Sequence, residues 1–84
     1  MSTGETDKVT VIDARGSFCP GPLMELIAAM RFAHPGDDLE VLSTDKGSAN
    51  DIPEWSRKAG HQIVGSFETD GVYHVRIRKM ERGL

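Results

Sequence analysis

The sequence predicts an α/β (α+β) two-layer sandwich with the element order β-α-β-α-β-β. Short runs rich in β-branched residues alternate with segments whose apolar residues recur at helical spacing. The dipeptide Asp70-Gly71, between two alternating segments near the end, is typical of a tight hairpin turn. We therefore expect a mixed four-stranded sheet with two helices on one face.

The first half of the chain predicts a strand, a helix and a second strand. Val9-Thr10-Val11-Ile12 is the first strand, and Leu39-Glu40-Val41-Leu42 is the second. The helix between them runs from Pro20 to the break at His34-Pro35-Gly36. Its apolar face forms part of the core and consists of Leu23, Leu26, Ile27 and Met30. A helix that joins two strands of one sheet makes a right-handed crossover, so these strands should be parallel.

The second helix has two candidate starts. Asp51 can act as the N-cap with Glu54 three residues later, or Ser48 can act as the N-cap with Asp51 in that position. Either start places Pro53 near the beginning, and Gly60 ends the helix. The residues expected to face inward are Ile52, Trp55 and Ala59.

The last two strands form the predicted hairpin. The first, from His61 to Phe67, should place Ile63 and Phe67 on one face. In the second, Tyr73, Val75 and Ile77 alternate with the polar residues His74, Arg76 and Arg78. A sheet face without a helix layer would explain this polar stripe.

Composition and termini predict one small domain at residues 9–80, with a flexible N-terminal tail at 1–8 and a C-terminal tail at 81–84. The N-terminus lacks the basic start and apolar run of a secretion signal, which predicts a cytoplasmic protein. No apolar stretch approaches the roughly 20 residues that span a bilayer, so we expect no membrane partner. The net charge of −3 argues against strong direct nucleic-acid binding. A local basic patch is the alternative, formed by Arg76, Arg78, Lys79 and Arg82.

The single cysteine lies in the stretch Cys19-Pro20-Gly21-Pro22-Leu23, at the start of the first predicted helix. Pro20 suits the first helical position, which makes Cys19 the N-cap. Because Pro20 and Pro22 have no amide hydrogen, we expect the amides of Gly21 and Leu23 to point toward the sulfur. Together with the helix dipole, they should lower the pKa of Cys19 from its reference value of about 8.5. The pattern favours a reactive thiol over a buried structural cysteine.

The predicted parallel strands bring two loops to one edge of the sheet. The segment Thr44-Asp45-Lys46-Gly47-Ser48 should lie near the loop from Arg15 to Cys19. Candidate partner contacts at this edge are Asp13, Arg15, Gly16, Asp45 and Lys46. The three histidines, His34, His61 and His74, are dispersed, and we predict neither a catalytic dyad with Cys19 nor a metal site.

The stretch from Ile12 to Pro22, with an Asp and a Gly before Cys-Pro-Gly-Pro, resembles the signature of the TusA (SirA-like) sulfur-carrier family. Pro35-Gly36-Asp37, Asp51-Ile52-Pro53 and Glu68-Thr69-Asp70-Gly71 also resemble family positions. The similarity extends from Val9 to Lys79 without an evident insertion. Gly21 occupies a variable position at which some members carry an acidic residue.

The resemblance implies that Cys19 accepts sulfane sulfur from a cysteine desulfurase or a rhodanese and passes it to an acceptor protein. Family members serve tRNA thiolation, molybdenum-cofactor supply or sulfur oxidation. It implies sulfurtransferase-type chemistry in a carrier rather than a free-standing enzyme, with the sulfur carried covalently and no cofactor. The family fold, β-α-β-α-β-β, agrees with the order derived from the residues. The alternative is a thiol-based redox regulator or interaction module that signals through oxidation of Cys19.

Overall fold

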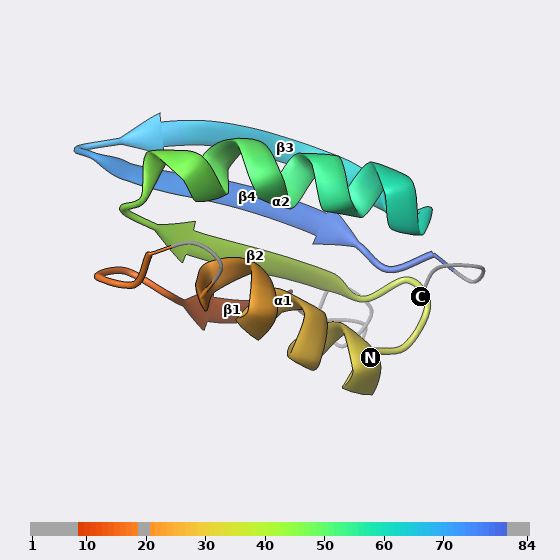
Figure 1. The fold of residues 1–84 in the computed structure, drawn as a ribbon. Helices are drawn as coiled ribbons and strands as arrows, with labels where there is room; N and C mark the ends of the chain where they lie inside the picture. The colour runs from red at the N-terminus through yellow and green to blue at the C-terminus, as the bar shows by residue number, and fades with distance from the viewer. Residues whose placement is uncertain (1–8, 19–20, 81–84) are drawn as a thin grey trace, which may run out of the picture.

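The computed structural model describes residues 9–18 and 21–80. Figure 1 shows the elements in the predicted order β-α-β-α-β-β. They are β1 (Val9–Asp13), α1 (Gly21–Phe32), β2 (Asp38–Ser43), α2 (Lys46–Ala59), β3 (Gln62–Thr69) and β4 (Val72–Arg78). The predicted tails, residues 1–8 and 81–84, lie outside the described residues.

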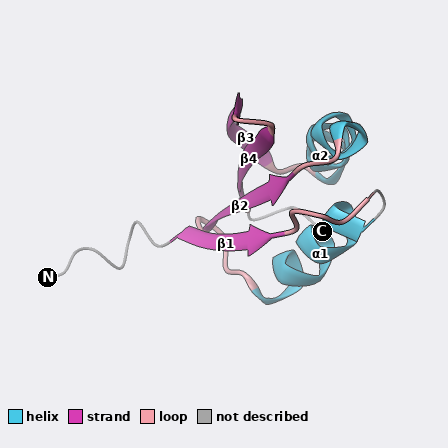
Figure 2. Ribbon diagram, turned by 90° about the vertical axis from the view of Figure 1, so that its left-hand side faces the viewer, coloured by secondary structure: helices cyan, strands magenta, loops and turns pink. Residues whose placement is uncertain are grey.

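The four strands form one mixed sheet in the order β1-β2-β4-β3. β1 and β2 are parallel, as the crossover rule predicts, and β4 is antiparallel to both β2 and β3. Both helices cover the same face, which confirms the two-layer sandwich (Figure 2). Within residues 9–18 and 21–80, no helix is long and apolar enough to cross a bilayer.

The core lies between the helix layer and one face of the sheet. Leu26 and Met30 of α1 pack against alternate residues of the strands because helical and strand periods both gather apolar side chains on one side. Leu23 and Trp55 pack against this core and remain partly exposed. The buried cluster consists of Ile12, Ala14, Leu26, Met30, Leu39, Val41, Ile52, Val75 and Ile77.

The start of α2 differs from both predictions. The N-cap is Asp45, whose backbone is extended and whose carboxylate accepts a hydrogen bond from the Ser48 amide at 3.1 Å. Ser48 lies in the first turn, and its buried hydroxyl donates to the same carboxylate at 2.9 Å. Asp51 and Pro53 are inside the helix, so both predicted starts are wrong. The predicted end is confirmed, because Gly60 has a left-handed φ of 89°.

The hairpin turn is confirmed, but one face assignment in β3 is wrong. Asp70 and Gly71 both have positive φ, as a tight hairpin turn of this type requires. The pairing of β3 with β4 shifts by one residue between Ile63 and Gly65. This bulge inverts the alternation, so Ile63 packs against the core while Phe67 lies on the opposite, uncovered face.

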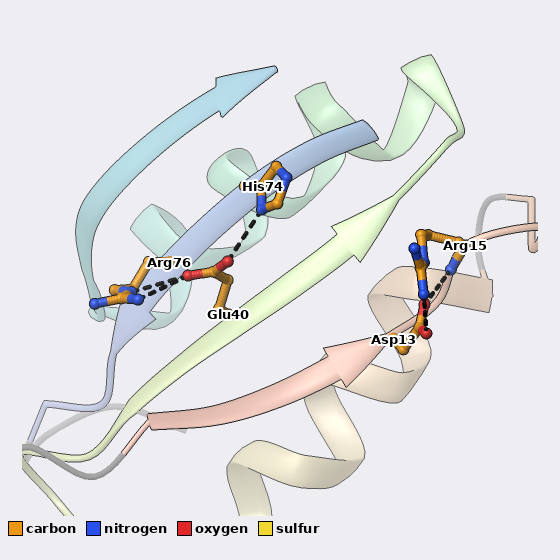
Figure 3. Close-up of polar contacts among 5 residues, drawn as sticks. All are labelled: Asp13, Arg15, Glu40, His74 and Arg76. Carbon is orange, nitrogen blue, oxygen red and sulfur yellow. Dashed lines mark hydrogen bonds and ion pairs between the residues drawn. The ribbon is translucent and has the colours of Figure 1, made fainter. Parts of the chain in front are cut away.

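The uncovered face carries the predicted polar stripe. Glu40 of β2 accepts hydrogen bonds from Arg76 at 2.8 and 3.1 Å, and its other oxygen lies 3.0 Å from Nδ1 of His74 (Figure 3). Next along the strands, Arg78 binds Asp38 at 2.8 Å. The bonds with His74 and Arg76 hold the pKa of Glu40 below its ordinary value. These pairs link β2 to β4 on the side that lacks helices.

Candidate functional site

The carboxyl ends of β1 and β2 meet at one edge, where two loops are joined by hydrogen bonds. The amide of Ala14 donates to the carbonyl of Leu42 at 2.9 Å and so extends the ladder beyond β1. The amide of Gly16 then donates to the hydroxyl of Thr44 at 3.0 Å. The predicted proximity of the two loops is therefore confirmed. Gly16 has a φ of 86°, a conformation that glycine adopts without strain.

Asp13 and Arg15 form a two-pronged ion pair at this edge (Figure 3). Nε and Nη2 of Arg15 donate to the two carboxylate oxygens of Asp13 at 2.8 and 2.7 Å. The backbone amide of Arg15 also donates to Asp13, at 3.2 Å. The side-chain hydrogen bonds from Arg15 lower the pKa of Asp13 from its ordinary 3.8 to about 2. Both side chains are about half exposed, and their contact with a partner stays a prediction.

The other two charged candidates lie at the start of α2. Asp45 is half-buried, and its carboxylate is occupied as the helix cap. Its own amide donates to the hydroxyl of Ser43 at 3.0 Å, which fixes the turn between β2 and α2. Lys46 is the first residue of α2 and is exposed. Asp45 therefore has a structural role that the sequence interpretation missed, while Lys46 remains available to a partner.

The cysteine motif leads into α1. Cys19 and Pro20 lie outside the described residues, so the predicted N-cap and the predicted pKa of Cys19 stay predictions. Gly21 is the first residue of α1, and its amide donates to the carbonyl of Phe18 at 2.7 Å. The Gly21 amide therefore already has a backbone acceptor, and its orientation toward the sulfur stays a prediction because Cys19 lies outside the described residues. Pro22 is buried, and Leu23 packs against the core.

Two exposed apolar side chains flank the motif and were missed in the sequence interpretation. Phe18 precedes Cys19 and is 78% exposed, and Met24 in the first turns of α1 is 58% exposed. Met24 lies outside the apolar stripe of the helix. Its place in the sequence therefore already indicated that this apolar side chain would be exposed. Exposed apolar residues beside a motif are typical of surfaces that other proteins contact.

The basic residues near the end of the chain are engaged within the molecule. Arg76 and Arg78 bind Glu40 and Asp38, as described above. Nζ of Lys79 donates to the carbonyls of Met30 and Ala33 at 2.7 and 2.8 Å, at the C-terminus of α1. Arg82 of the predicted basic patch lies outside the described residues.

The fold and the sequence together define a class of protein: a small α+β sandwich with one cysteine motif at the start of its first helix. The family model described as "Sulfurtransferase TusA" matches residues 10–79. The chain therefore belongs to the TusA family.

Relatives and a solved structure agree with this assignment. A sulfur carrier protein TusA of Pseudomonas aeruginosa is 39% identical over 69 residues, which cover 82% of this chain and 87% of that protein. A protein of Archaeoglobus fulgidus, provisionally named a sulfur carrier protein, is 45% identical over 73 residues, 87% of this chain and 100% of that one. The crystal structure of a SirA-like protein from Desulfitobacterium hafniense superposes with a TM-score of 0.77 at 26% identity, covering 88% of this chain and 100% of that chain.

Proposed function

We propose that this chain is a sulfur-relay carrier in which Cys19 accepts sulfane sulfur as a persulfide and passes it to an acceptor protein. The observation that carries the proposal is the family match over residues 10–79, in a chain whose only thiol belongs to the family motif. The family is one of sulfur carriers, and a carrier has both a donor and an acceptor. We infer a cysteine desulfurase or rhodanese as donor. The acceptor serves tRNA thiolation, molybdenum-cofactor supply or sulfur oxidation.

The chemistry requires only an accessible thiolate. The thiolate of Cys19 attacks the terminal sulfur of the donor's persulfide, a new S–S bond forms on Cys19, and the donor's S–S bond breaks as its thiolate leaves. A thiolate of the acceptor then attacks the terminal sulfur carried by Cys19. A new S–S bond forms on the acceptor, the S–S bond on Cys19 breaks, and Cys19 is released as a thiolate. Neither step consumes an oxidant, because the transferred sulfur keeps its oxidation state.

The surroundings of the motif suit transfer between two proteins. The loop at residues 14–18 is anchored to β2 and to Thr44, so its backbone is held while the side chains of Arg15 and Phe18 are exposed. Phe18 and Met24 supply apolar contact area, and Arg15 and Lys46 supply charge at the rim. In α1 the partial positive charge of the helix N-terminus favours an anionic sulfur at the preceding residues.

The first prediction is that Cys19→Ser abolishes sulfur loading and leaves the fold intact. Serine is a good N-cap of nearly the same shape, so the thermal midpoint should stay within the error of the measurement. The protein is incubated with a sulfur-loaded desulfurase, and its intact mass is recorded. The wild-type chain should gain the mass of one sulfur, which a reductant then removes. Loading that persists in Cys19→Ser would contradict the proposal.

The same assay separates the carrier from the redox regulator. A carrier gains sulfur from the loaded donor, whereas a regulator is oxidised by dilute peroxide and ignores the donor. Oxidation of Cys19 by peroxide without any sulfur gain from a desulfurase or a rhodanese would favour the regulator.

A further inference from the structure

The loop at residues 14–18, which leads to Cys19, is tied to the rest of the molecule at two points. The Ala14 amide binds the Leu42 carbonyl at 2.9 Å, which fixes the start of the loop to β2. Two residues further on, the Gly16 amide donates to Oγ1 of Thr44 at 3.0 Å. The second bond joins the backbone of the loop to a side chain of the connection between β2 and α2.

Thr44 lies in a short connection that is itself well held. Ser43, before it, is buried at the end of β2, and Asp45, after it, is the N-cap of α2. The Asp45 amide donates to the Ser43 hydroxyl at 3.0 Å, and the Asp45 carboxylate binds Ser48. Because both of its neighbours are held, Thr44 is a fixed anchor for the loop.

On the loop side, Gly16 is the third residue of a tight turn from Ala14 to Ser17. The Ser17 amide donates to the Ala14 carbonyl at 3.1 Å, and the φ of Gly16 is 86°, as in a type II turn. A type I turn keeps the same closing hydrogen bond but turns over the peptide between Arg15 and Gly16, so the Gly16 amide points the other way. The bond to Thr44 therefore requires a positive φ at position 16.

We propose that Thr44 is a positioning residue for sulfur transfer, because its hydroxyl holds the tip of the Ala14–Ser17 turn and so keeps the loop before Cys19 in one place. This inference rests on the proposed function. The carbonyl of Phe18, which follows the turn, accepts a hydrogen bond from the Gly21 amide at 2.7 Å, so the loop is also held next to the helix. A thiolate must meet the donor's terminal sulfur along the S–S bond that breaks, and a misplacement of about 1 Å can lower a rate about 100-fold.

The bond between Gly16 and Thr44 acts on the loop rather than on the stability of the whole domain. Both residues are exposed, so water replaces the lost partner when the bond is removed. Neither residue belongs to the buried core. Removing the bond should therefore leave the thermal midpoint unchanged while it frees the tip of the turn.

The first test compares Thr44→Val, which keeps the shape and removes the acceptor, with Thr44→Ser, which keeps the hydroxyl. Single-turnover transfer is measured against the concentration of a sulfur-loaded desulfurase or rhodanese, whichever loads the wild type. At saturating donor, Thr44→Val should be slower by about three- to tenfold, the factor by which one hydrogen bond biases a local equilibrium. The half-saturating donor concentration should not change. Thr44→Ser should match the wild type, as should the control Thr10→Val, which makes the same change at an exposed position of β1.

A second pair of variants tests the same bond from the loop side. A Cβ added at Gly16 meets no atom within 4 Å, so Gly16→Ala changes the preference for φ without a steric clash. Alanine disfavours the positive φ and should favour the type I turn, whereas asparagine tolerates positive φ. Gly16→Ala should therefore slow transfer as Thr44→Val does, and Gly16→Asn should slow it less.

Backbone ¹⁵N order parameters of the loop amides give a readout that needs no sulfur donor. They should fall from about 0.85 in the wild type toward about 0.6 in Thr44→Val, and stay high in Thr44→Ser. Unchanged order parameters in Thr44→Val overturn the proposal, as does a wild-type transfer rate in that variant or equal slowing in Thr44→Ser. A rise in the half-saturating donor concentration alone also overturns it, because Thr44 would then contact the donor directly. A wild type that gains no sulfur refutes the proposed function, and the order parameters still decide whether Thr44 holds the loop.

Discussion

The motif edge and the uncovered face of the sheet hold their charges in different ways. At the motif edge, Asp13 binds Arg15 two residues away, and both side chains are about half exposed. On the uncovered face, Glu40 is only 15% exposed and binds His74 and Arg76 from another strand, more than 30 residues away in sequence. A local pair can shape a loop with little effect on stability, whereas the long-range cluster exists only in the folded protein.

The largest stability effect in this comparison is expected for Glu40→Gln. The amide keeps the shape of the side chain but loses the charge-assisted bonds with Arg76, so unfolding should become easier by about 1–2 kcal/mol. For a domain of this size, that corresponds to a fall in the thermal midpoint of roughly 5–10 °C. Asp13→Asn is the matched control and should leave the midpoint unchanged. Equal midpoints for Glu40→Gln and the wild type would show that the cluster does not stabilise the fold.

The free energy of unfolding of the wild type and of Glu40→Gln should also differ in its dependence on pH. The pKa of Glu40 lies below its ordinary 4.5 in the folded state, so the folded chain loses this proton more readily than the unfolded chain. The contribution of Glu40 is therefore fully present above about pH 5, and it declines as the pH falls through the folded pKa. Unfolding by denaturant at several pH values should show the wild type and Glu40→Gln converging below pH 4.5. A gap that is constant down to pH 3 would contradict the lowered pKa.

The cap of α2 should give a smaller effect. Asp45→Ala removes the acceptor for the Ser48 amide and should cost about 1 kcal/mol, whereas Asp45→Ser keeps a capping oxygen and should cost less. The two variants also separate structure from recognition. If sulfur transfer slows only in Asp45→Ala, the cap is responsible. If it slows equally in both, the carboxylate contacts a partner directly.

The fold was predictable from the sequence because its signals agreed with one another. The β-branched runs, the helical stripe of Leu26 and Met30 and the Asp70-Gly71 turn all favour one topology, and the crossover rule then fixes the parallel pair. The shared edge of the two loops follows from that topology alone.

The structure differs from the sequence predictions where two local signals compete or where the sequence carries no clear signal. Ser48 and Asp51 each begin a plausible capping pattern, but the polar group that meets the first turn belongs to Asp45, in the connection between β2 and α2. The signal for the bulge was Gly65 beside Val64, because a glycine inside a strand often marks a bulge, and strict alternation through it puts Phe67 on the wrong face. The motif also does not reveal that the Gly21 amide donates to the carbonyl of Phe18.

The smallest effects are expected for the rim charges around the motif. Arg15→Ala and Lys46→Ala should slow sulfur transfer from a loaded donor by roughly two- to fivefold, because rim charges act mainly on the association rate. The effect should shrink as salt is raised, since exposed charges are screened. Thermal midpoints should be unchanged, because neither side chain supports the core. Arg76→Ala is the control on the uncovered face and should transfer sulfur at the wild-type rate.

Asp13→Asn shows how Arg15 acts. If Arg15 meets the partner, its release from Asp13 should leave the transfer rate equal or higher, while Arg15→Ala lowers it. If the pair only shapes the loop, both substitutions should slow transfer alike, because each breaks the two-pronged ion pair between Asp13 and Arg15. We expect the first pattern, since Arg15 is about half exposed even when paired and can exchange one carboxylate for another at little cost. Slow transfer in Arg76→Ala alone would instead place the docking surface on the uncovered face of the sheet and remove the motif edge from recognition.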